Sequence, residues 1–162
     1  MSKSLLVPFA TTVLVRDNCL CLHIQRAARA LARRFDEALR PLDITNGQFS
    51  LLMSLNRPEP PSISMVASLL AMDRTTLTAA LKPLERRGLI DVLVDPEDRR
   101  LRRLRLTAEG ERLLAEAVPI WKETHAEVDG QLGATVPDRL RADLVALTQD
   151  GTRAAEILSV EA

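Results

Sequence analysis

Apolar side chains recur every three or four residues along most of this chain, which is the spacing of amphipathic helices. The first such stripe runs from Cys19 to Leu39, and Pro41 is expected to end its helix. The apolar members of this stripe are Leu20, Ile24, Ala27, Leu31, Phe35 and Ala38. Residues 1–17 show no clear period, so we expect a loose, flexible N-terminal arm there.

Three short helices are predicted between residues 45 and 88, because three residues that favour helix N-termini each precede an apolar stripe. Thr45, Ser62 and Asp73 are these caps, and Gly88 marks the end of the third helix. The apolar positions are Phe49, Leu52 and Leu55 in the first helix, Ile63, Val66, Ala67 and Leu70 in the second, and Leu77, Leu81 and Leu84 in the third.

Two short strands follow at residues 89–94 and 101–106, joined by a turn-rich loop at 95–100. In the second strand Leu104 and Leu106 alternate with Arg103 and Arg105. Because successive side chains of a strand point to opposite faces, we expect one face of this hairpin to be buried and the other to be basic.

The C-terminal third is predicted to be helical. A long helix begins at Thr107, and the last helix opens at Thr135 and Pro137. The stripe of the long helix comprises Leu114, Val118, Trp121, His125, Val128 and Leu132. The stripe of the last helix, with alternating spacings of four and three, comprises Leu140, Leu144, Leu147, Gly151, Ala154 and Leu158. That alternation is the heptad spacing of a helix that packs against another helix.

The charge balance hides a segregation of charges. There are 22 basic and 22 acidic side chains, but residues 73–106 hold 9 basic and 6 acidic ones, whereas residues 107–162 hold 5 and 11. Five arginines lie between residues 99 and 105. Aromatic residues are only 2% of the chain, too few to stack the bases of a single-stranded nucleic acid.

The two cysteines, Cys19 and Cys21, are too few for a disulfide framework and fit a reducing, cytoplasmic setting. The longest mostly apolar stretch, residues 5–15, is far shorter than the roughly 20 residues of a membrane span, so we expect no membrane association. No metal-ligand spacing, phosphate-binding glycine loop or nucleophile motif is present, and we expect neither a cofactor nor an enzyme.

The second and third short helices are separated by a few residues, which suggests a helix-turn-helix. The second helix of that motif enters the major groove of double-stranded DNA, where arginine pairs with guanine and threonine contacts a base or a thymine methyl. Its outward residues here are Arg74, Thr75, Thr76, Thr78, Ala79 and Lys82. The basic hairpin would then be a wing whose tip arginine enters the minor groove.

The order of elements predicts a mainly helical fold with a small β hairpin. A winged helix-turn-helix at 45–106 follows a first dimerisation helix at 18–44 and precedes dimerisation helices at 107–162. The stripes of the flanking helices are too long for one small winged domain to cover, so we expect a homodimer. A two-fold dimer would bind a palindromic operator.

Four segments make the chain resemble the MarR family of bacterial transcription regulators: MDRTTLT at 72–78, LERRGLI at 84–90, DPEDRR at 95–100 and LTAEG at 106–110. The resemblance implies a homodimer with one winged helix-turn-helix in each subunit. It implies that Arg100 is the minor-groove arginine of the wing and that Asp98 orients it. It assigns the major groove to Arg74, Thr75, Thr76 and Thr78, and backbone phosphates to Ser62, Ser64 and Arg86; Lys82, Arg99 and Arg102 complete the predicted DNA contacts.

The resemblance also implies a small effector, commonly aromatic and anionic, whose binding releases DNA. The candidates are His23, Arg26, Met53, Trp121 and His125. Arg26 beside His23 could bind a carboxylate. Each candidate has a structural alternative, since tryptophan and methionine are common in cores and the others suit a solvent-exposed face. The predicted function is therefore a repressor released by an aromatic or acyl carboxylate.

Two alternatives remain open. One branch of the family senses peroxides through a cysteine near the first helix, and Cys19 is the candidate here, with Arg16 nearby. Against this alternative, that branch typically surrounds its cysteine with tyrosines, and this chain has none. Cys19 and Cys21 would also lie about 200° apart on a continuous helix, too far apart to bond each other. The second alternative is a winged-helix module that contacts other proteins.

Overall fold

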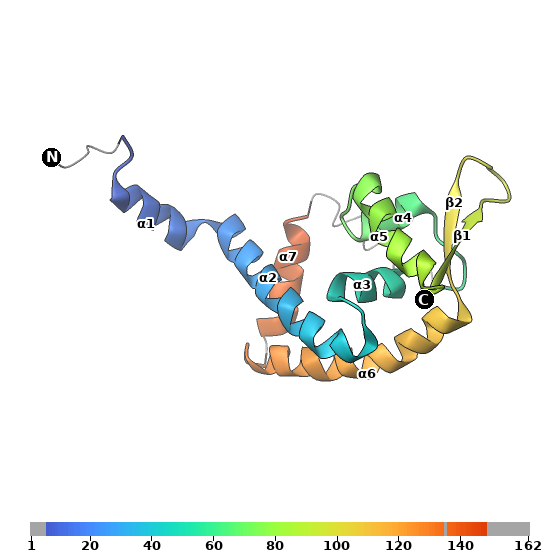
Figure 1. Ribbon diagram of the computed structural model, residues 1–162. Coiled ribbons are helices and arrows are strands. Elements are labelled where there is room, and N and C mark those ends of the chain that lie inside the picture. The colour runs from blue at the N-terminus through green and yellow to red at the C-terminus, as the bar shows by residue number, and fades with distance from the viewer. Residues whose placement is uncertain (1–5, 135, 149–162) are drawn as a thin grey trace. The chain divides into compact units, whose positions relative to one another are not determined.

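The computed structural model describes residues 6–134 and 136–148 (Figure 1). Internal contacts divide the chain into two units, Met1–Arg34 and Phe35–Ala162. The elements in chain order are α1 (Phe9–Asn18), α2 (Leu20–Leu39), the 3-10 helix η1 (Arg40–Leu42), α3 (Asn46–Ser54), α4 (Ile63–Leu69), α5 (Arg74–Arg86), β1 (Ile90–Val94), β2 (Arg102–Leu106), α6 (Ala108–Gly130) and α7 (Val136–Ala146). A mainly helical chain with one small hairpin is therefore confirmed.

The N-terminal arm differs from the prediction. A ten-residue helix, α1, occupies Phe9–Asn18, where a loose arm was expected. Cys19 then adopts an extended backbone (φ −72°, ψ 104°) and separates α1 from α2. The apolar residues Phe9, Leu14 and Val15 are all exposed. Because α1 buries none of its residues, no apolar stripe marked it in the sequence.

The predicted helix caps are confirmed. Thr45, Ser62, Asp73 and Thr107 each accept a backbone N–H of the first turn through a side-chain oxygen. At the start of α3 the cap is reciprocal: Thr45 Oγ1 accepts from the Gln48 amide at 3.2 Å, and Gln48 Oε1 accepts from the Thr45 amide at 3.0 Å. Such caps satisfy N–H groups that a helix leaves without partners, which is why short local patterns located these four helix starts.

The two strands form an antiparallel hairpin in which Ile90 pairs with Leu106 and Val94 pairs with Arg102. Leu104 and Leu106 are buried, as the alternation predicts. The loop before α4 also joins the hairpin: the Leu104 amide donates to the Pro61 carbonyl at 2.9 Å. The hairpin is thereby attached to the start of α4 as well as to the end of α5.

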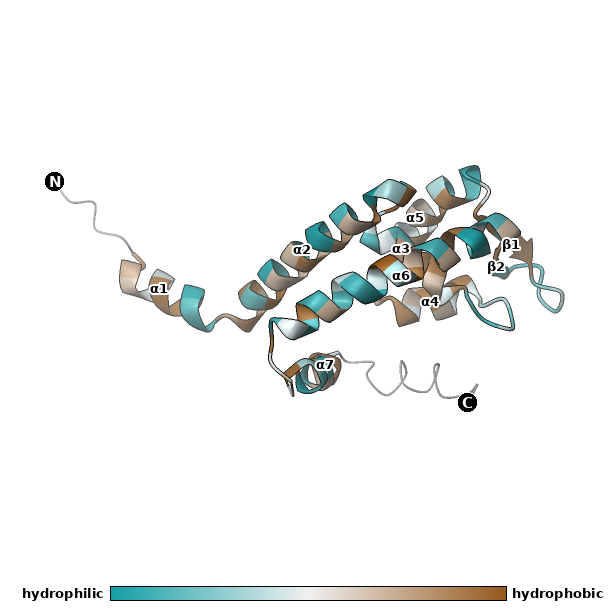
Figure 2. Cartoon of the chain, turned by 90° about the horizontal axis from the view of Figure 1, so that it is seen from below, coloured by the Kyte–Doolittle hydropathy of each residue, from teal (hydrophilic) through white to brown (hydrophobic). Residues whose placement is uncertain are grey.

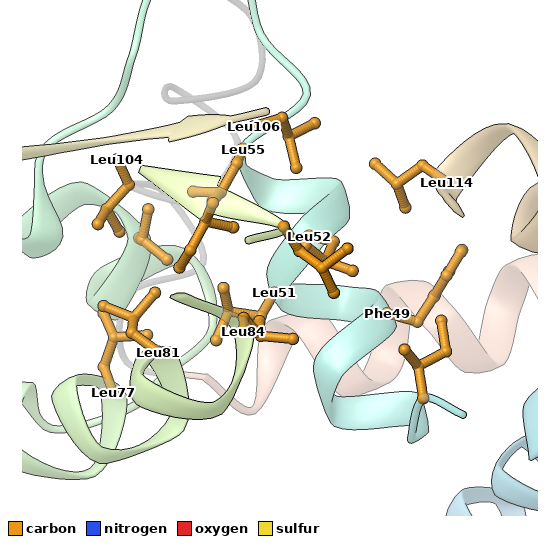
Figure 3. Packing of buried hydrophobic residues seen from close by; sticks show 14 of the residues in the cluster. Phe49, Leu51, Leu52, Leu55, Leu77, Leu81, Leu84, Leu104, Leu106 and Leu114 are labelled. Atoms are coloured by element: carbon orange, nitrogen blue, oxygen red, sulfur yellow. The ribbon is translucent and has the colours of Figure 1, made fainter. Parts of the chain in front are cut away.

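One leucine-rich core lies beneath the three short helices and the hairpin (Figure 3). Its most deeply buried side chains come from α2, α3, α4, α5 and both strands: Leu39, Leu51, Leu52, Val66, Leu77, Leu84, Ile90 and Leu104. The three leucines predicted for α5 are all part of this core, so the side of α5 that carries its polar residues faces outward.

The C-terminal helices follow the prediction in part. Thr107 opens α6 as expected, but the helix ends at Gly130, so Leu132 lies beyond it and is not part of its stripe. Leu140 and Leu144 of α7 are 40% and 39% exposed, and Leu147 follows the end of the helix. Thr135, Gly151, Ala154 and Leu158 lie outside the described residues. Within the described ranges, no helix has the length and hydropathy of a membrane span.

The close packing of α6 on the base of the hairpin yields a stability prediction. A Cβ at Gly110 would lie 2.1 Å from the Leu89 carbonyl oxygen, whereas a Cβ at Gly130 would meet nothing within 4 Å. We expect Gly110→Ala to destabilise the fold by about 1–3 kcal/mol, since backbone must move. Gly130→Ala, the matched control, should be neutral or stabilising by up to about 1 kcal/mol. Equal thermal denaturation midpoints for the two variants would contradict this packing.

Candidate nucleic-acid interface

Helices α4 and α5 form the two arms of a helix-turn-helix. The turn between them is closed by a 2.9 Å hydrogen bond from the Met72 amide to the Ala67 carbonyl. Ala71 adopts a left-handed backbone there (φ 51°). That conformation costs a residue with a Cβ about 1–2 kcal/mol, so the packing of both helices on the common core must hold the turn.

The outward face of α5 gathers four of the predicted DNA contacts. Arg74, Thr75, Thr78 and Lys82 line one shallow depression of about 330 Å³ together with Ala79. The Thr78 hydroxyl donates to the Arg74 carbonyl at 2.7 Å, which leaves its methyl group and oxygen lone pairs available. Donors, acceptors and a methyl group on one helix face are the groups that read base edges in a major groove.

Thr76 has a different role from the other threonines of α5. Its hydroxyl donates to Asp73 Oδ2 at 2.6 Å, and its amide donates to Asp73 Oδ1 at 2.8 Å. These hydrogen bonds stabilise the ionised carboxylate and lower the pKa of Asp73 from its ordinary value. Because the hydroxyl proton is used within the cap, Thr76 can offer DNA only its lone pairs and methyl group.

The wing loop is built around Asp95, which the sequence analysis did not single out. Asp95 is only 4% exposed. Its Oδ1 accepts from the amides of Glu97 (2.8 Å) and Asp98 (3.1 Å), and its Oδ2 accepts from Arg103 Nε at 2.6 Å. The signal for this role was the aspartate at the first position of the loop, where its side chain can bond to backbone amides further along.

These hydrogen bonds lower the pKa of Asp95, with the Arg103 guanidinium as the largest cause and the Glu97 amide next. A carboxyl whose folded pKa lies below its ordinary value of 3.8 stabilises the fold fully above that value. The contribution disappears as the pH falls below 3.8 toward the folded pKa. The wing loop is therefore held by an ionised Asp95 throughout the neutral range.

Arg99 and Arg100 are exposed at the tip of the wing, in the hydrophilic loop seen in Figure 2. The expected contact between Asp98 and the Arg100 guanidinium is wrong: Asp98 Oδ1 instead accepts from the Arg100 backbone amide at 2.9 Å. An aspartate two residues before an amide closes a local turn more readily than it reaches a long side chain. Asp98 therefore fixes the path of the backbone at Arg100 and leaves the guanidinium unconstrained.

The remaining arginines of the wing have partners within the hairpin, and Arg103 also reaches the Pro60 carbonyl outside it. Arg102 Nη1 donates to the carbonyls of Arg99 (2.8 Å) and Leu101 (3.1 Å). Arg103 pairs with Asp95, and Arg105 Nη2 pairs with Asp91 Oδ2 at 2.8 Å. The basic face that the alternation predicts is present, but most of its guanidinium groups already have protein partners.

The predicted phosphate contacts lie at helix ends. Ser62 Oγ accepts from the Met65 amide at 3.2 Å as the cap of α4, while Ser64 is exposed in its first turn. Arg86 is exposed at the end of α5. Its neighbour Arg87, which sequence reasoning missed, donates through Nη1 to the Asp43 carbonyl. That bond ties the end of α5 to the turn that follows α2.

The effector candidates fall into two groups. In the unit Phe35–Ala162, Trp121 stacks on His125 with ring centroids 4.6 Å apart, and Phe49 stacks on Trp121 at 6.1 Å. Met53 packs against the core as a partly buried side chain. In the unit Met1–Arg34, the two other candidates lie along one groove of about 570 Å³ on α2, which is lined by His23, Arg26, Ala27, Arg29, Ala30 and Arg33. The structure thus provides an aromatic row and a basic groove.

The redox candidate Cys19 is partly buried, and its Sγ accepts from the Leu22 amide at 3.4 Å at the start of α2. Because Cys19 has an extended backbone and α2 begins at Leu20, Cys19 and Cys21 do not lie on one continuous helix, and the predicted separation of about 200° is wrong. Cys21 is exposed. Among the described residues, no cluster of three or more His, Cys, Asp or Glu could hold a metal ion.

Residues 44–101, from the end of the turn after α2 to the wing, match the model of the MarR family. The transcriptional regulator HosA of Escherichia coli O111:H- is 38% identical over 92 residues, which are 56% of this chain and 67% of HosA. The chain belongs to the MarR family. A further relative, the organic hydroperoxide resistance transcriptional regulator of Bacillus subtilis (strain 168), is 32% identical over 64% of this chain and 71% of its own length.

Solved MarR-family structures share this fold. The Mycobacterium tuberculosis transcriptional regulator MosR in complex with DNA is 38% identical, with a TM-score of 0.74 over 88% of this chain and 100% of its own. The winged helix-turn-helix described above is thus that of a MarR-family DNA-binding transcription regulator, and the protein is not an enzyme.

For this MarR-family chain, the wing tip is tested by Arg100→Ala. We expect specific DNA binding to weaken by about 1–3 kcal/mol, because an exposed guanidinium that enters a groove loses its contact. Asp98→Ala should cause part of that loss by releasing the backbone of Arg100. Arg105→Ala is the matched control, since Arg105 belongs to the same hairpin but is paired with Asp91.

The measurement is a fluorescence-anisotropy titration of a duplex that the wild-type protein enriches from a randomised pool. The slope of log affinity against log salt concentration should become shallower for Arg100→Ala, by about the contribution of one ionic contact per subunit. Equal affinities for the wild type and Arg100→Ala would remove the wing tip from the interface.

Proposed function

We propose that this MarR-family regulator is a cytoplasmic homodimeric repressor that binds a palindromic operator and leaves it when a small aromatic or acyl carboxylate binds. The observation that carries the proposal is the exposed polar face of α5 beside a wing with arginines at its tip. That face carries arginine and threonine rather than apolar groups, which disfavours a module that mainly contacts other proteins.

The proposed reading of DNA assigns a role to each exposed group. Arg74 pairs with a guanine edge, and Thr75, Thr76 and Thr78 contact bases through methyl groups and lone pairs. Arg99 and Arg100 enter the adjacent minor groove, where narrow A·T-rich DNA concentrates negative potential. Backbone phosphates are assigned to Ser62, Ser64, Lys82, Arg86 and Arg102, whose exposed or helix-terminal positions suit anions.

The proposed dimer rests on apolar surface that the single chain leaves uncovered. Leu140, Leu144 and Val145 of α7 are exposed, and so are Leu20 and Leu31 of α2. Large apolar side chains left exposed along a helix are typical of an interaction site in soluble proteins. A second copy would cover these side chains. The two α5 helices of the dimer would then lie about 34 Å apart, which is one turn of DNA. The dimerisation helices are then those at 18–44 and 107–162.

Leu144→Asp tests the dimer. A charge on this face of α7 would be desolvated in a dimer interface, so we expect monomers or unfolded protein. Ala142→Asp is the matched control, because Ala142 is exposed on the same helix about 200° away. Sedimentation velocity measures the state of assembly. A wild-type chain that binds its operator as a stable monomer would refute the proposed dimer.

The two groups of candidates offer different chemistry to the proposed effector. In the unit Met1–Arg34, Arg26 and His23 would bind a carboxylate, since a guanidinium forms two parallel hydrogen bonds to it. In the unit Phe35–Ala162, Trp121, His125 and Met53 offer surface suited to an aromatic or acyl group. Such a ligand shifts the population away from the DNA-binding arrangement only by its differential affinity for the two arrangements.

Cysteine-based sensing is the second candidate function. Cys19 lies immediately before α2, and its Sγ accepts a hydrogen bond from the Leu22 amide at 3.4 Å. A relative in Bacillus subtilis is named an organic hydroperoxide resistance regulator. In this alternative, peroxide would oxidise Cys19 to a sulfenic acid, and that modification would release DNA in place of a bound carboxylate.

One titration separates the two candidates. Aromatic and acyl carboxylates should each be tested against the protein–operator complex, and an effector should lower DNA affinity about 5–150-fold. Arg26→Ala should raise the concentration required, whereas Arg16→Ala, an exposed arginine paired with Asp17, should not. If no acid releases DNA, cumene hydroperoxide does, and Cys19→Ser abolishes that release, the redox alternative replaces the carboxylate.

A further inference from the structure

The wing loop needs support from outside the hairpin if its tip is to meet DNA in a defined position. Residues 95–101 extend from two five-residue strands, and the loop is exposed apart from Asp95. A two-stranded hairpin is marginally stable alone. The contacts at the root of the loop therefore decide how firmly Arg99 and Arg100 are held.

Asp95 and Arg103 form that root. The Asp95 carboxylate is 4% exposed and the Arg103 side chain 35% exposed, so the 2.6 Å contact between Oδ2 and Nε is partly shielded from water. The other oxygen of Asp95 holds the amides of Glu97 and Asp98 at 2.8 and 3.1 Å. One carboxylate thus connects the path of the loop to a guanidinium on β2.

Arg103 also reaches a second element. Its Nη1 donates to the Pro60 carbonyl at 3.0 Å, in the loop before α4. The neighbouring Leu104 amide donates to Pro61, and Ser62 forms a β-bridge with Arg103 itself. The guanidinium therefore spans from the wing loop to the residues immediately ahead of the α4 cap.

We propose that Asp95 and Arg103 are positioning residues for DNA recognition. They hold the wing tip and the start of α4 in a fixed relative position, so that both can contact the same DNA. This inference rests on the proposed DNA contacts of Arg99, Arg100, Ser62 and Ser64. Arg103 itself does not touch DNA, although it lies within the arginine run, because two edges of its guanidinium are bonded to Asp95 and Pro60.

Two substitutions isolate the bridge. Asp95→Asn keeps an oxygen for the amides of Glu97 and Asp98 but presents an NH₂ group to Arg103 Nε, so the turn remains and the bridge is lost. Arg103→Lys keeps the charge but replaces the planar fork by one ammonium, which cannot reproduce both contacts in the same geometry. The double variant completes a double-mutant cycle, which measures whether the two side chains act on DNA binding together or independently.

The hairpin offers a matched control. Asp91 and Arg105 form a second ion pair across the same two strands, at 2.8 Å, and are direct neighbours in the strand register. Among the described residues, the side chains of this pair bond only within the hairpin. Asp91→Asn therefore removes an ion pair of the same kind while the connection to α4 remains.

Operator affinity is measured with a duplex that the wild-type protein enriches from a randomised pool. We expect Asp95→Asn and Arg103→Lys each to weaken binding about 5–20-fold, and the double variant to be no weaker than the weaker single variant. Asp91→Asn should stay within about twofold of the wild type. Every variant should stay fully folded at the temperature of the titration, although loss of the Asp95–Arg103 pair should lower the denaturation midpoint below that of the wild type.

Footprinting separates positioning from a general loss of structure. Hydroxyl-radical protection of the minor groove by the wing should disappear in Asp95→Asn, while protection of guanine N7 by α5 should persist. Parallel loss of both protections in a variant that is no longer fully folded at the temperature of the titration would overturn the inference. The inference would also be overturned if Arg103→Lys kept full affinity and Asp95→Asn bound DNA more tightly than the wild type. That pair of results is expected of an arginine that contacts phosphate, because lysine keeps the positive charge and asparagine removes a nearby negative one. If the wild type enriches no duplex, the proposed function fails first.

Discussion

Burial of Leu77, Leu81 and Leu84 is the constraint on which the DNA-reading part of this protein depends. These side chains are at most 4% exposed and pack against α3, α4 and both strands in one core. A helix anchored along one side has no freedom to rotate about its axis, because any rotation would expose leucine to water. The polar face of α5 is thereby held outward by the burial of the leucines on its opposite side.

The wing is held by polar bonds rather than by a core. Apolar anchoring ends at Leu104 and Leu106, and beyond them Asp95 connects two loop amides to Arg103, which in turn reaches Pro60. A network of this kind is directional and leaves the tip residues to the solvent. Hydrophobic packing thus fixes the orientation of α5, whereas hydrogen bonds fix the position of the wing.

Local patterns in the sequence were sufficient for most of the fold. Thr45, Ser62, Asp73 and Thr107 could be placed because a cap and its partner lie three residues apart. The contact from Arg103 to Pro60 could not, since it joins residues 43 positions apart. Helix α1 escaped prediction for another reason: it buries nothing, so periodicity carried no signal.

Charge pairing in the wing bears on how a chain of zero net charge can bind a polyanion. Arg103 and Arg105 are neutralised by Asp95 and Asp91, whereas Arg99 and Arg100 are exposed at the tip. Asp91 and Asp95 therefore shape the hairpin through Arg105 and Arg103 and are not paired with the arginines at its tip. Because counterion release depends on the cations that meet phosphates and not on the sum over the chain, the salt dependence of binding should follow the basic side chains that contact phosphates.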